Sequence, residues 1–368
     1  MDAPDHRSAS AQQCAEQRLG VRRETETSGD HMRFEATLHR VDTGGPRRLI
    51  QGTQFIVGET PHTFWDDDLV EKNHAFLRGI DPGYFTHVAA VHAPCVESED
   101  CEERQRAAAA IRVAHSQALE TFCALLAAAV QAPGFALGWM LRYENRDLHA
   151  LVGKLHRGER VYSMLPGDTT WESLSTAVHR FQLGDAARER ELTLAFARLW
   201  RRFAEQFLDR GRTQEYNSLK HGMRARLGGF KLSFGTERAP GEPPPPDAMT
   251  PPSGSMFGSA FYTAERVVPK QRDWALTERF RNWEPDDLRA GVELLSISIG
   301  NVVTFLRGTS GDTSQPNVLR YPENLEDFDA PWRARLAFET MNANTTVGPE
   351  HLKPWKDEDL RVAYPTRP

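Results

Sequence analysis

Apolar side chains recur with the period of an α-helix in three long stretches of the chain. Residues 102–131 show this pattern at spacings of three and four, and Pro133-Gly134 follows them. Residues 186–210 show it most clearly, with the stripe Leu192, Phe196, Leu199, Trp200, Phe203 and Phe207. A third stretch begins near Pro285. Such spacing places apolar side chains on one helical face, so the pattern predicts three amphipathic core helices.

Local signals place the ends of these helices. Proline at the first helical position, followed by Asp286 and Asp287, is a typical helix start. Gly211 predicts the end of the second helix, since glycine is common just after a helix. Asp66, Asp67 and Asp68 precede another helical pattern, which favours an N-cap over a metal site. His115 lies on the apolar stripe of the first helix, so we expect a satisfied core or edge histidine.

Strand patterns are fewer and shorter. Residues 32–40 alternate apolar and polar positions, a turn cluster follows at 42–46, and Leu49 to Val57 has strand character. Together they predict a β-hairpin. Short strands are also expected at 230–234 and 260–268. Between these two, residues 238–256 are too rich in proline and glycine for a helix or a central strand. We interpret this segment as an exposed loop, either a domain linker or, preferably, a long hairpin insertion.

The predicted fold class is mainly α, a helical bundle with a small β-hairpin component. Residues 1–30 are polar and lack a period that would bury one face, so they predict a flexible tail. Residues 31–310 form the mainly helical domain that carries the loop insertion 238–256. Residues 311–368 are rich in proline and predict an irregular C-terminal tail.

Composition adds few constraints. The 368 residues are 39% hydrophobic and 26% charged, which is ordinary for a globular protein, and the net charge is −6. The four cysteines do not form a disulfide framework, which favours a reducing compartment. The N-terminus lacks the apolar core of a secretory signal, and the longest apolar run, Phe122 to Val130, is too short to span a membrane. We therefore expect a cytoplasmic protein without a membrane partner.

Common catalytic motifs are missing from the sequence. It contains no phosphate-binding loop, Rossmann glycine fingerprint, nucleophile elbow or His-Glu-x-x-His pair. His87, His92, Cys95 and Cys101 are the types of residue that bind zinc, but their spacing matches no standard ligand pairing. Acidic neighbours of Cys101 favour a solvated loop instead. We therefore expect neither a cofactor nor a metal.

A basic segment is the strongest functional candidate. Arg188 to Lys231 holds eleven positive and five negative side chains, a net charge of +6. Clustered arginine and lysine beside a histidine can hold a phosphate, although arginines on the solvent face of a helix give the same pattern. His221 is suited to proton transfer near neutral pH. Asn217 precedes it by one helical turn, so both share a face. The candidate anion-binding residues are Arg212, Lys220, Arg224 and Arg226.

The run Tyr216-Asn-Ser-Leu-Lys-His-Gly222 resembles the polar-residue-to-histidine motif of HEPN domains. These domains are compact helical bundles, often dimeric. The resemblance implies metal-independent RNA cleavage, in which the 2′-hydroxyl attacks the adjacent phosphate. It implies that His221 is the acid or base, that Asn217 is its polar partner, and that Arg212 or Arg224 holds the phosphate.

The sequence departs from that motif in the position of the arginine. Eight residues separate Arg212 from His221, and positions 214 to 216 hold Gln, Glu and Tyr. The sequence therefore fits two interpretations: an active RNase in bacterial stress or defence, or a divergent or inactive relative of HEPN domains. The alternative from another class is a non-catalytic helical scaffold or regulatory protein, which binds a protein partner or a second copy of itself and presents the loop 238–256 as an extended segment.

Overall fold

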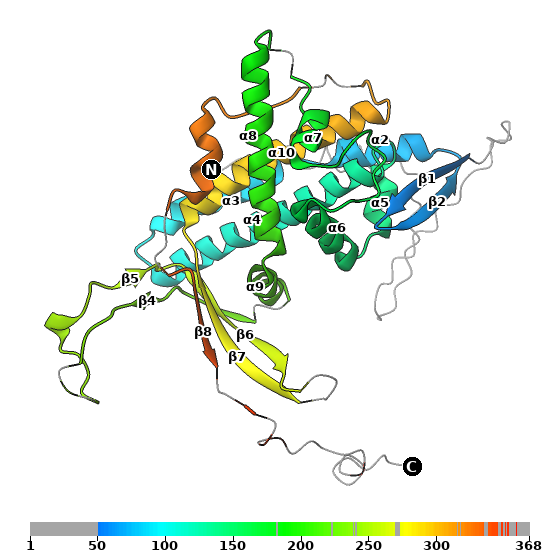
Figure 1. Ribbon diagram of the computed structural model, residues 1–368. Helices are drawn as coiled ribbons and strands as arrows, with labels where there is room; N and C mark the ends of the chain where they lie inside the picture. Colours follow the sequence, from blue (N-terminus) through cyan, green and yellow to red (C-terminus); the bar gives the residue numbers. More distant parts are fainter. Residues whose placement is uncertain are drawn as a thin grey trace, which may run out of the picture. The chain divides into compact units, whose positions relative to one another are not determined.

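Long helices make up most of the structure, and small antiparallel sheets are attached to them (Figure 1). The computed structural model describes residues 51–181, 183–221, 224–237, 239, 241–268, 273–314, 316, 318–334, 338–344, 347, 348, 350, 352 and 358. All of them belong to one compact unit, Leu49–Pro368. The predicted class, mainly α with some β, is confirmed.

The elements follow one another in the order β1 Gln51–Val57, β2 Thr60–Asp66, α2 Leu69–Gly79, α3 Gly83–His92, η1 Ala93–Glu97, α4 Cys101–Gln131, α5 Ala136–Arg142, α6 Asn145–Arg157, α7 Trp171–Val178, α8 Ala186–Leu208, α9 Arg210–Lys220, β3 Ala225–Leu227, β4 Lys231–Leu232, η2 Pro246–Ala248, β5 Ser253–Gly254, β6 Gly258–Arg266, β7 Trp274–Asn282, α10 Pro285–Thr309, η3 Leu325–Trp332 and β8 Thr340–Asn344.

The three predicted core helices are α4, α8 and α10, and their existence is confirmed. All six apolar residues of the predicted α8 stripe are buried. Helix α4 packs against α3, α6, α8 and α10. Burying one large apolar side chain stabilises the fold by about 1.5–3 kcal/mol, so this stripe fixes α8 against α4, α6, α7 and η3. The indole N–H of Trp200 also donates to the Ser298 hydroxyl on α10 at 3.0 Å.

A four-stranded antiparallel sheet, in the order β3-β6-β7-β8, lies beside the helices. The predicted strand at 260–268 corresponds to β6, which pairs with β7 along its whole length. Strands β4 and β5 pair with each other, Lys231 opposite Gly254, so the proline-rich segment closes a hairpin. Helix α9 contacts α4 and α8 on one side and β3 and β6 on the other, which places it between the helices and the sheet (Figure 1).

Some expectations from the sequence require correction, and others fall outside the described residues. Strand β1 forms its hairpin with β2, Val57 opposite Thr60, and the second strand of that hairpin was not predicted. The proposed tail 1–30 and strand 32–40 lie outside the described residues. Beyond residue 310 the chain is not wholly irregular. Phe328 in η3 is buried in the core. Strand β8 pairs with the edge of β7 and so supplies the hydrogen-bond partners that an open strand edge lacks.

Two described helices, α4 and α10, are long and apolar enough to cross a membrane by length and composition. Most of their apolar windows are buried inside the protein, 72% for α4 and 61% for α10. Core helices of this kind satisfy the same criterion, so the finding is weak evidence for a membrane.

Candidate functional site

Asp209 joins α8 to α9 and begins the candidate site. The sequence predicted that the helix ends at Gly211, but α8 ends at Leu208 and Gly211 lies within α9. The Asp209 carboxylate accepts from the backbone N–H of Arg212 at 3.0 Å and thereby caps the new helix. A Cβ at position 211 would lie 2.7 Å from Arg281 Nη2, so glycine here allows Arg281 to approach Asp209.

Glu215 is the buried centre of the site. Its Oε2 accepts from Arg112 Nη2 at 2.6 Å, and its Oε1 accepts from Ser259 and from the indole N–H of Trp283, both at 2.7 Å. Burial alone raises the pKa of a carboxyl, but the Arg112 charge and these hydrogen bonds outweigh it and lower the pKa of Glu215. Glu215 therefore stays ionised and ties α9 to α4, to β6 and to Trp283, which follows β7.

One side of α9 lines a cavity of about 580 Å³, which we call the α9 cavity. Five of its α9 lining residues are spaced so that they share a face: Arg210, Thr213, Tyr216, Asn217 and Lys220. Arg212 of α9 also lines it. Helices α4, α6 and α8 supply the remaining wall. Burial, together with Glu120, raises the pKa of Tyr216 to about 12, so this phenol stays protonated.

The structure brings together four of the six residues expected to form the site. Arg212, Asn217, Lys220 and His221 all line the α9 cavity. His221 caps the C-terminus of α9, where its backbone N–H donates to Asn217 O at 3.0 Å. Gly222 lies outside the described residues.

The other two predicted residues lie elsewhere. Arg224 does not line the α9 cavity, and its backbone N–H donates to Ser218 O at 2.7 Å. Arg226 points from β3 to an ion pair with Glu278 on β7. Helical spacing along the sequence could not place these two arginines, because the chain turns from helix to strand between Lys220 and Ala225.

His149 also lines the α9 cavity, and the sequence analysis missed it. It lies on α6, its ring stacks on Phe207 at 4.4 Å, and burial lowers its pKa below 6.5, partly opposed by Glu120. No motif surrounds it. The only signal in the sequence is a histidine within the amphipathic pattern of residues 145–157.

Two cations of the α9 cavity are not neutralised. Among the described residues, Arg210 and Lys220 have no carboxylate partner, and the Lys220 ammonium lies 5.4 Å from the centre of the Tyr216 ring. Arg212, in contrast, pairs with Glu339 at 2.8 Å and is 3.9 Å from Asp209. Burial, together with repulsion from Arg112, lowers the pKa of Arg212 to about 10.

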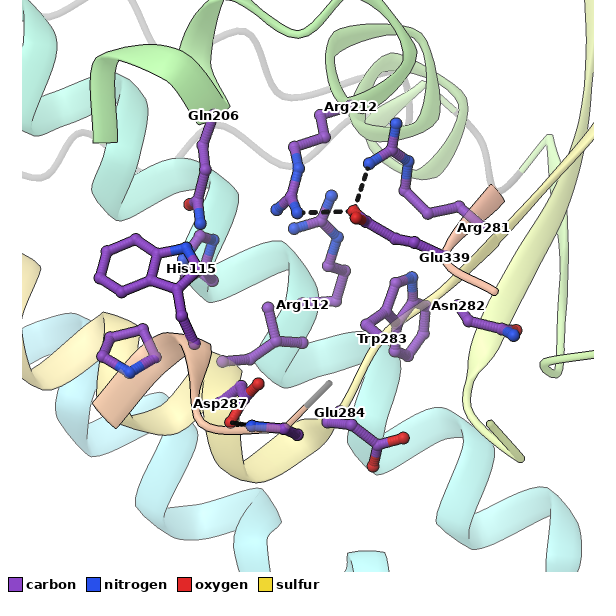
Figure 2. A pocket seen from close by; sticks show the side chains of 14 residues that line it. Arg112, His115, Gln206, Arg212, Arg281, Asn282, Trp283, Glu284, Asp287 and Glu339 are labelled. Carbon is purple, nitrogen blue, oxygen red and sulfur yellow. Dashed lines mark hydrogen bonds and ion pairs between the residues drawn. The ribbon is translucent and has the colours of Figure 1, made fainter. Parts of the chain in front are cut away.

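A second cavity, of about 420 Å³, lies next to the first, and we call it the arginine cavity. Arg112, Gln206 and Arg212 line both cavities. Figure 2 shows Glu339 between Arg212 and Arg281, and its Oε1 accepts from both, at 2.8 and 2.9 Å. Arg281 also donates to Asp209 at 3.1 Å. The arginine side chains are thus held in fixed positions at the rim.

His115 lines the arginine cavity and is 2% exposed. The sequence favoured a satisfied core histidine, but its buried Nδ1 has no hydrogen-bond partner among the described residues. Burial and the charges of Arg112 and Arg212 hold the pKa of His115 well below 6.5, so the ring is neutral. The Oε1 of Gln206 is likewise buried without a partner among those residues.

Metal-binding geometry is limited in the described part of the chain. There, the one group of three or more potential ligand atoms within 4.8 Å of one another is that of Asp66, Asp67 and Asp68. Asp68 stands at the N-cap of α2 as predicted, yet its side chain makes no capping hydrogen bond and pairs with Lys72 at 2.5 Å. The set His87, His92, Cys95 and Cys101 forms no such group among the described residues.

Comparisons with protein-family models, with curated proteins and with solved structures find no match.

Proposed function

We propose that the protein binds RNA in the α9 cavity and cleaves it there without a metal ion. The observation that carries this proposal is the convergence of Arg212, Asn217, Lys220 and His221 on that one cavity. Residues 216–222, which resemble the HEPN motif, contribute Asn217, Lys220 and His221 to this set. We propose that the protein is a divergent HEPN-like protein. It would act in the cytoplasm, in bacterial stress or defence.

Electrostatics supports an anionic ligand. Arg210 and Lys220 lack carboxylate partners among the described residues, so a phosphate can neutralise them without breaking an ion pair. Arg146 is on the same wall, although Glu144 pairs with it at 3.0 Å. Glu120 is the acidic residue of the lining, and the basic side chains outnumber it. The cavity therefore favours a polyanion over a neutral or cationic ligand.

The chemistry requires one group that removes a proton and one that donates a proton. The 2′-oxygen of a ribose attacks the adjacent phosphorus, and the bond from phosphorus to the 5′-oxygen breaks. A neutral histidine accepts the 2′-hydroxyl proton, and a protonated histidine donates to the leaving 5′-oxygen. The products are a 2′,3′-cyclic phosphate and a 5′-hydroxyl. We assign the acid role to His221 and the base role to His149, because burial favours the neutral form of His149.

The test uses purified protein with a mixture of single-stranded and structured RNA, with and without EDTA. His221→Ala is expected to remove EDTA-resistant cleavage and keep the fold, because His221 is exposed at a helix end. His87→Ala is the matched control, since His87 is an exposed histidine of α3 outside both cavities. It should cleave as the wild type does.

Unchanged cleavage by His221→Ala contradicts the assigned role. Absence of both cleavage and salt-sensitive RNA retention in the wild type contradicts RNA binding itself. That second outcome favours the protein-partner alternative, for which β6 and β7 offer the exposed apolar side chains of Tyr262, Trp274 and Leu276.

A further inference from the structure

We propose that the arginine cavity binds a mononucleotide, whose phosphate replaces the Glu339 carboxylate between Arg212 and Arg281. This inference goes beyond RNA cleavage. The two cavities share Arg112, Gln206 and Arg212, but the inference rests on Arg281 and Glu339, which do not line the α9 cavity, and its test contains no RNA.

Glu339 occupies the position of an anionic ligand group. One carboxylate oxygen accepts from Arg212 Nη2 at 2.8 Å and from Arg281 Nη1 at 2.9 Å (Figure 2). Two guanidinium groups that converge on one oxygen also fit the oxygens of a phosphate, which guanidinium binds in a planar fork. Without Glu339, Arg281 still pairs with Asp209 at 3.1 Å, and Arg212 lies 3.9 Å from the same carboxylate.

Glu339 can leave this position at little cost. Its side chain is 47% exposed, whereas that of Arg281 is 6% exposed. A half-exposed carboxylate regains its hydration when it swings into water, and exposed ion pairs contribute little to stability. Arg281 keeps its ion pairs with Asp209 and Glu215 when Glu339 leaves. An incoming phosphate therefore competes with a half-exposed internal carboxylate for this pair of cations.

Two residues that line the cavity carry buried polar atoms that the described part of the protein does not use. His115 Nδ1 and Gln206 Oε1 are buried and lack hydrogen-bond partners among the described residues. The Nε2–Cδ2 edge of His115 lies against Gly291 of α10, where a Cβ would be 2.8 Å away, so Nδ1 lies on the opposite side of the ring. Buried polar atoms are normally paired, so these two favour a ligand that has a matching polar edge.

Aromatic side chains complete the wall. Trp283 and Trp332 line the cavity together with His115, and Arg202 covers the Trp332 ring at 3.6 Å from its centre. Flat rings of this kind stack on nucleobases, and an exocyclic amino group of a base can donate to Gln206 Oε1. The volume of about 420 Å³ is in the range for small-molecule sites. A phosphate fork beside aromatic walls and an unused acceptor matches a mononucleotide that bears an amino group.

Titration calorimetry of the full-length protein tests the proposal with four probes: adenosine 5′-monophosphate (AMP), inosine 5′-monophosphate, adenosine and inorganic phosphate. AMP should bind at least about tenfold more tightly than adenosine or inorganic phosphate, since only AMP fills both parts of the cavity. Inosine monophosphate replaces the amino group with a carbonyl, so it should bind several-fold more weakly than AMP.

Three variants localise the binding. Glu339→Gln removes the competing charge and should tighten AMP binding by about tenfold. Glu265→Gln makes the same change at a pair with Arg279 on the sheet and should leave the affinity unchanged. Gln206→Met keeps the side-chain length and removes the amide, so it should abolish the preference for AMP over inosine monophosphate.

The outcomes are decisive because Glu339→Gln removes the internal competitor. If neither the wild type nor Glu339→Gln binds AMP at millimolar concentration, the proposal is overturned. Equal affinities for AMP and inorganic phosphate also overturn it, since the cavity would then select an anion only. The two proposals fail independently. If the protein cleaves RNA but does not bind AMP, only the mononucleotide site is contradicted. If it binds AMP but cleaves no RNA, only the proposed function is contradicted.

Discussion

Arg112 on α4 and Glu215 on α9 form an ion pair of 2.6 Å, with exposed side-chain fractions of 3% and 0%. This pair joins the core helix to the helix that carries the candidate site. Ser259 and Trp283 fill the remaining hydrogen-bonding positions of Glu215, which keeps the buried charge fully satisfied. The Glu215 carboxylate thus anchors α9, which lines both cavities, to the core helix.

Glu215→Gln should lower the free energy of unfolding by about 3–5 kcal/mol, because it leaves the Arg112 charge buried without its counterion. Urea denaturation measures this loss. Glu265→Gln is the control, since its pair with Arg279 is half exposed and should be worth less than about 1 kcal/mol. Equal losses in the two variants would show that Glu215 does not hold the site together.

Stability should decrease as the pH falls below about 6.5, partly because of His179. Burial lowers the pKa of this histidine to about 3 in the folded protein. The unfolded chain therefore takes up a proton at higher pH than the folded chain, so acid favours unfolding. His179 alone should cost about 2–3 kcal/mol between pH 7 and pH 4.5. His115, whose pKa is also lowered by burial, adds to the loss.

The variant His179→Phe isolates this contribution. It keeps the ring stacked on Phe196, 4.0 Å from it in the wild type, and removes the titration. Urea denaturation at pH 7, 6 and 4.5 should show a smaller acid-induced loss than in the wild type. An identical pH dependence in both proteins would mean that His179 does not control acid stability.

The sequence predicted the long helices well because their apolar residues recur with the helical period within each segment. The apolar stripe of residues 192–207 and the proline at 285 are readable without any knowledge of neighbours. The error at Gly211 has a tertiary cause: Asp209 caps a new helix, and Arg281, which is distant in sequence, requires the space beside the glycine. Pairing of β8 with β7 is likewise a long-range contact that no local pattern indicates.

The candidate site was predicted only in its α9 part. Asn217, Lys220 and His221 lie on one helical face, and helical spacing is sufficient to group them. His149, Arg281 and Glu339 reach the two cavities from α6, β7 and the segment before β8. Their contribution depends on how distant elements pack, which residue spacing does not encode.

RNA affinity should depend on salt through Arg210 and Lys220. The double variant Arg210→Ala/Lys220→Ala should weaken RNA binding and reduce the slope of log affinity against log salt by about 1.4, or about 0.7 for each lost phosphate contact on a single strand. Filter binding at several salt concentrations measures both quantities. Arg224→Ala/Arg226→Ala removes the same charge outside the α9 cavity and should change the slope less. A larger effect from this control would place the RNA elsewhere.

Cleavage should lose activity on the acid side of about pH 6.5 through His149. Burial lowers the pKa of His149 below 6.5, so the base is mostly neutral at pH 6.5 and becomes protonated as the pH falls further. His149→Gln should lower the rate by about 10²–10⁴-fold and remove this acid limb, because glutamine does not titrate. Initial rates from pH 4.5 to 8.5 provide the test, with circular dichroism at each pH to follow folding. An acid limb that persists in His149→Gln, with the protein still folded, would assign the base to another group.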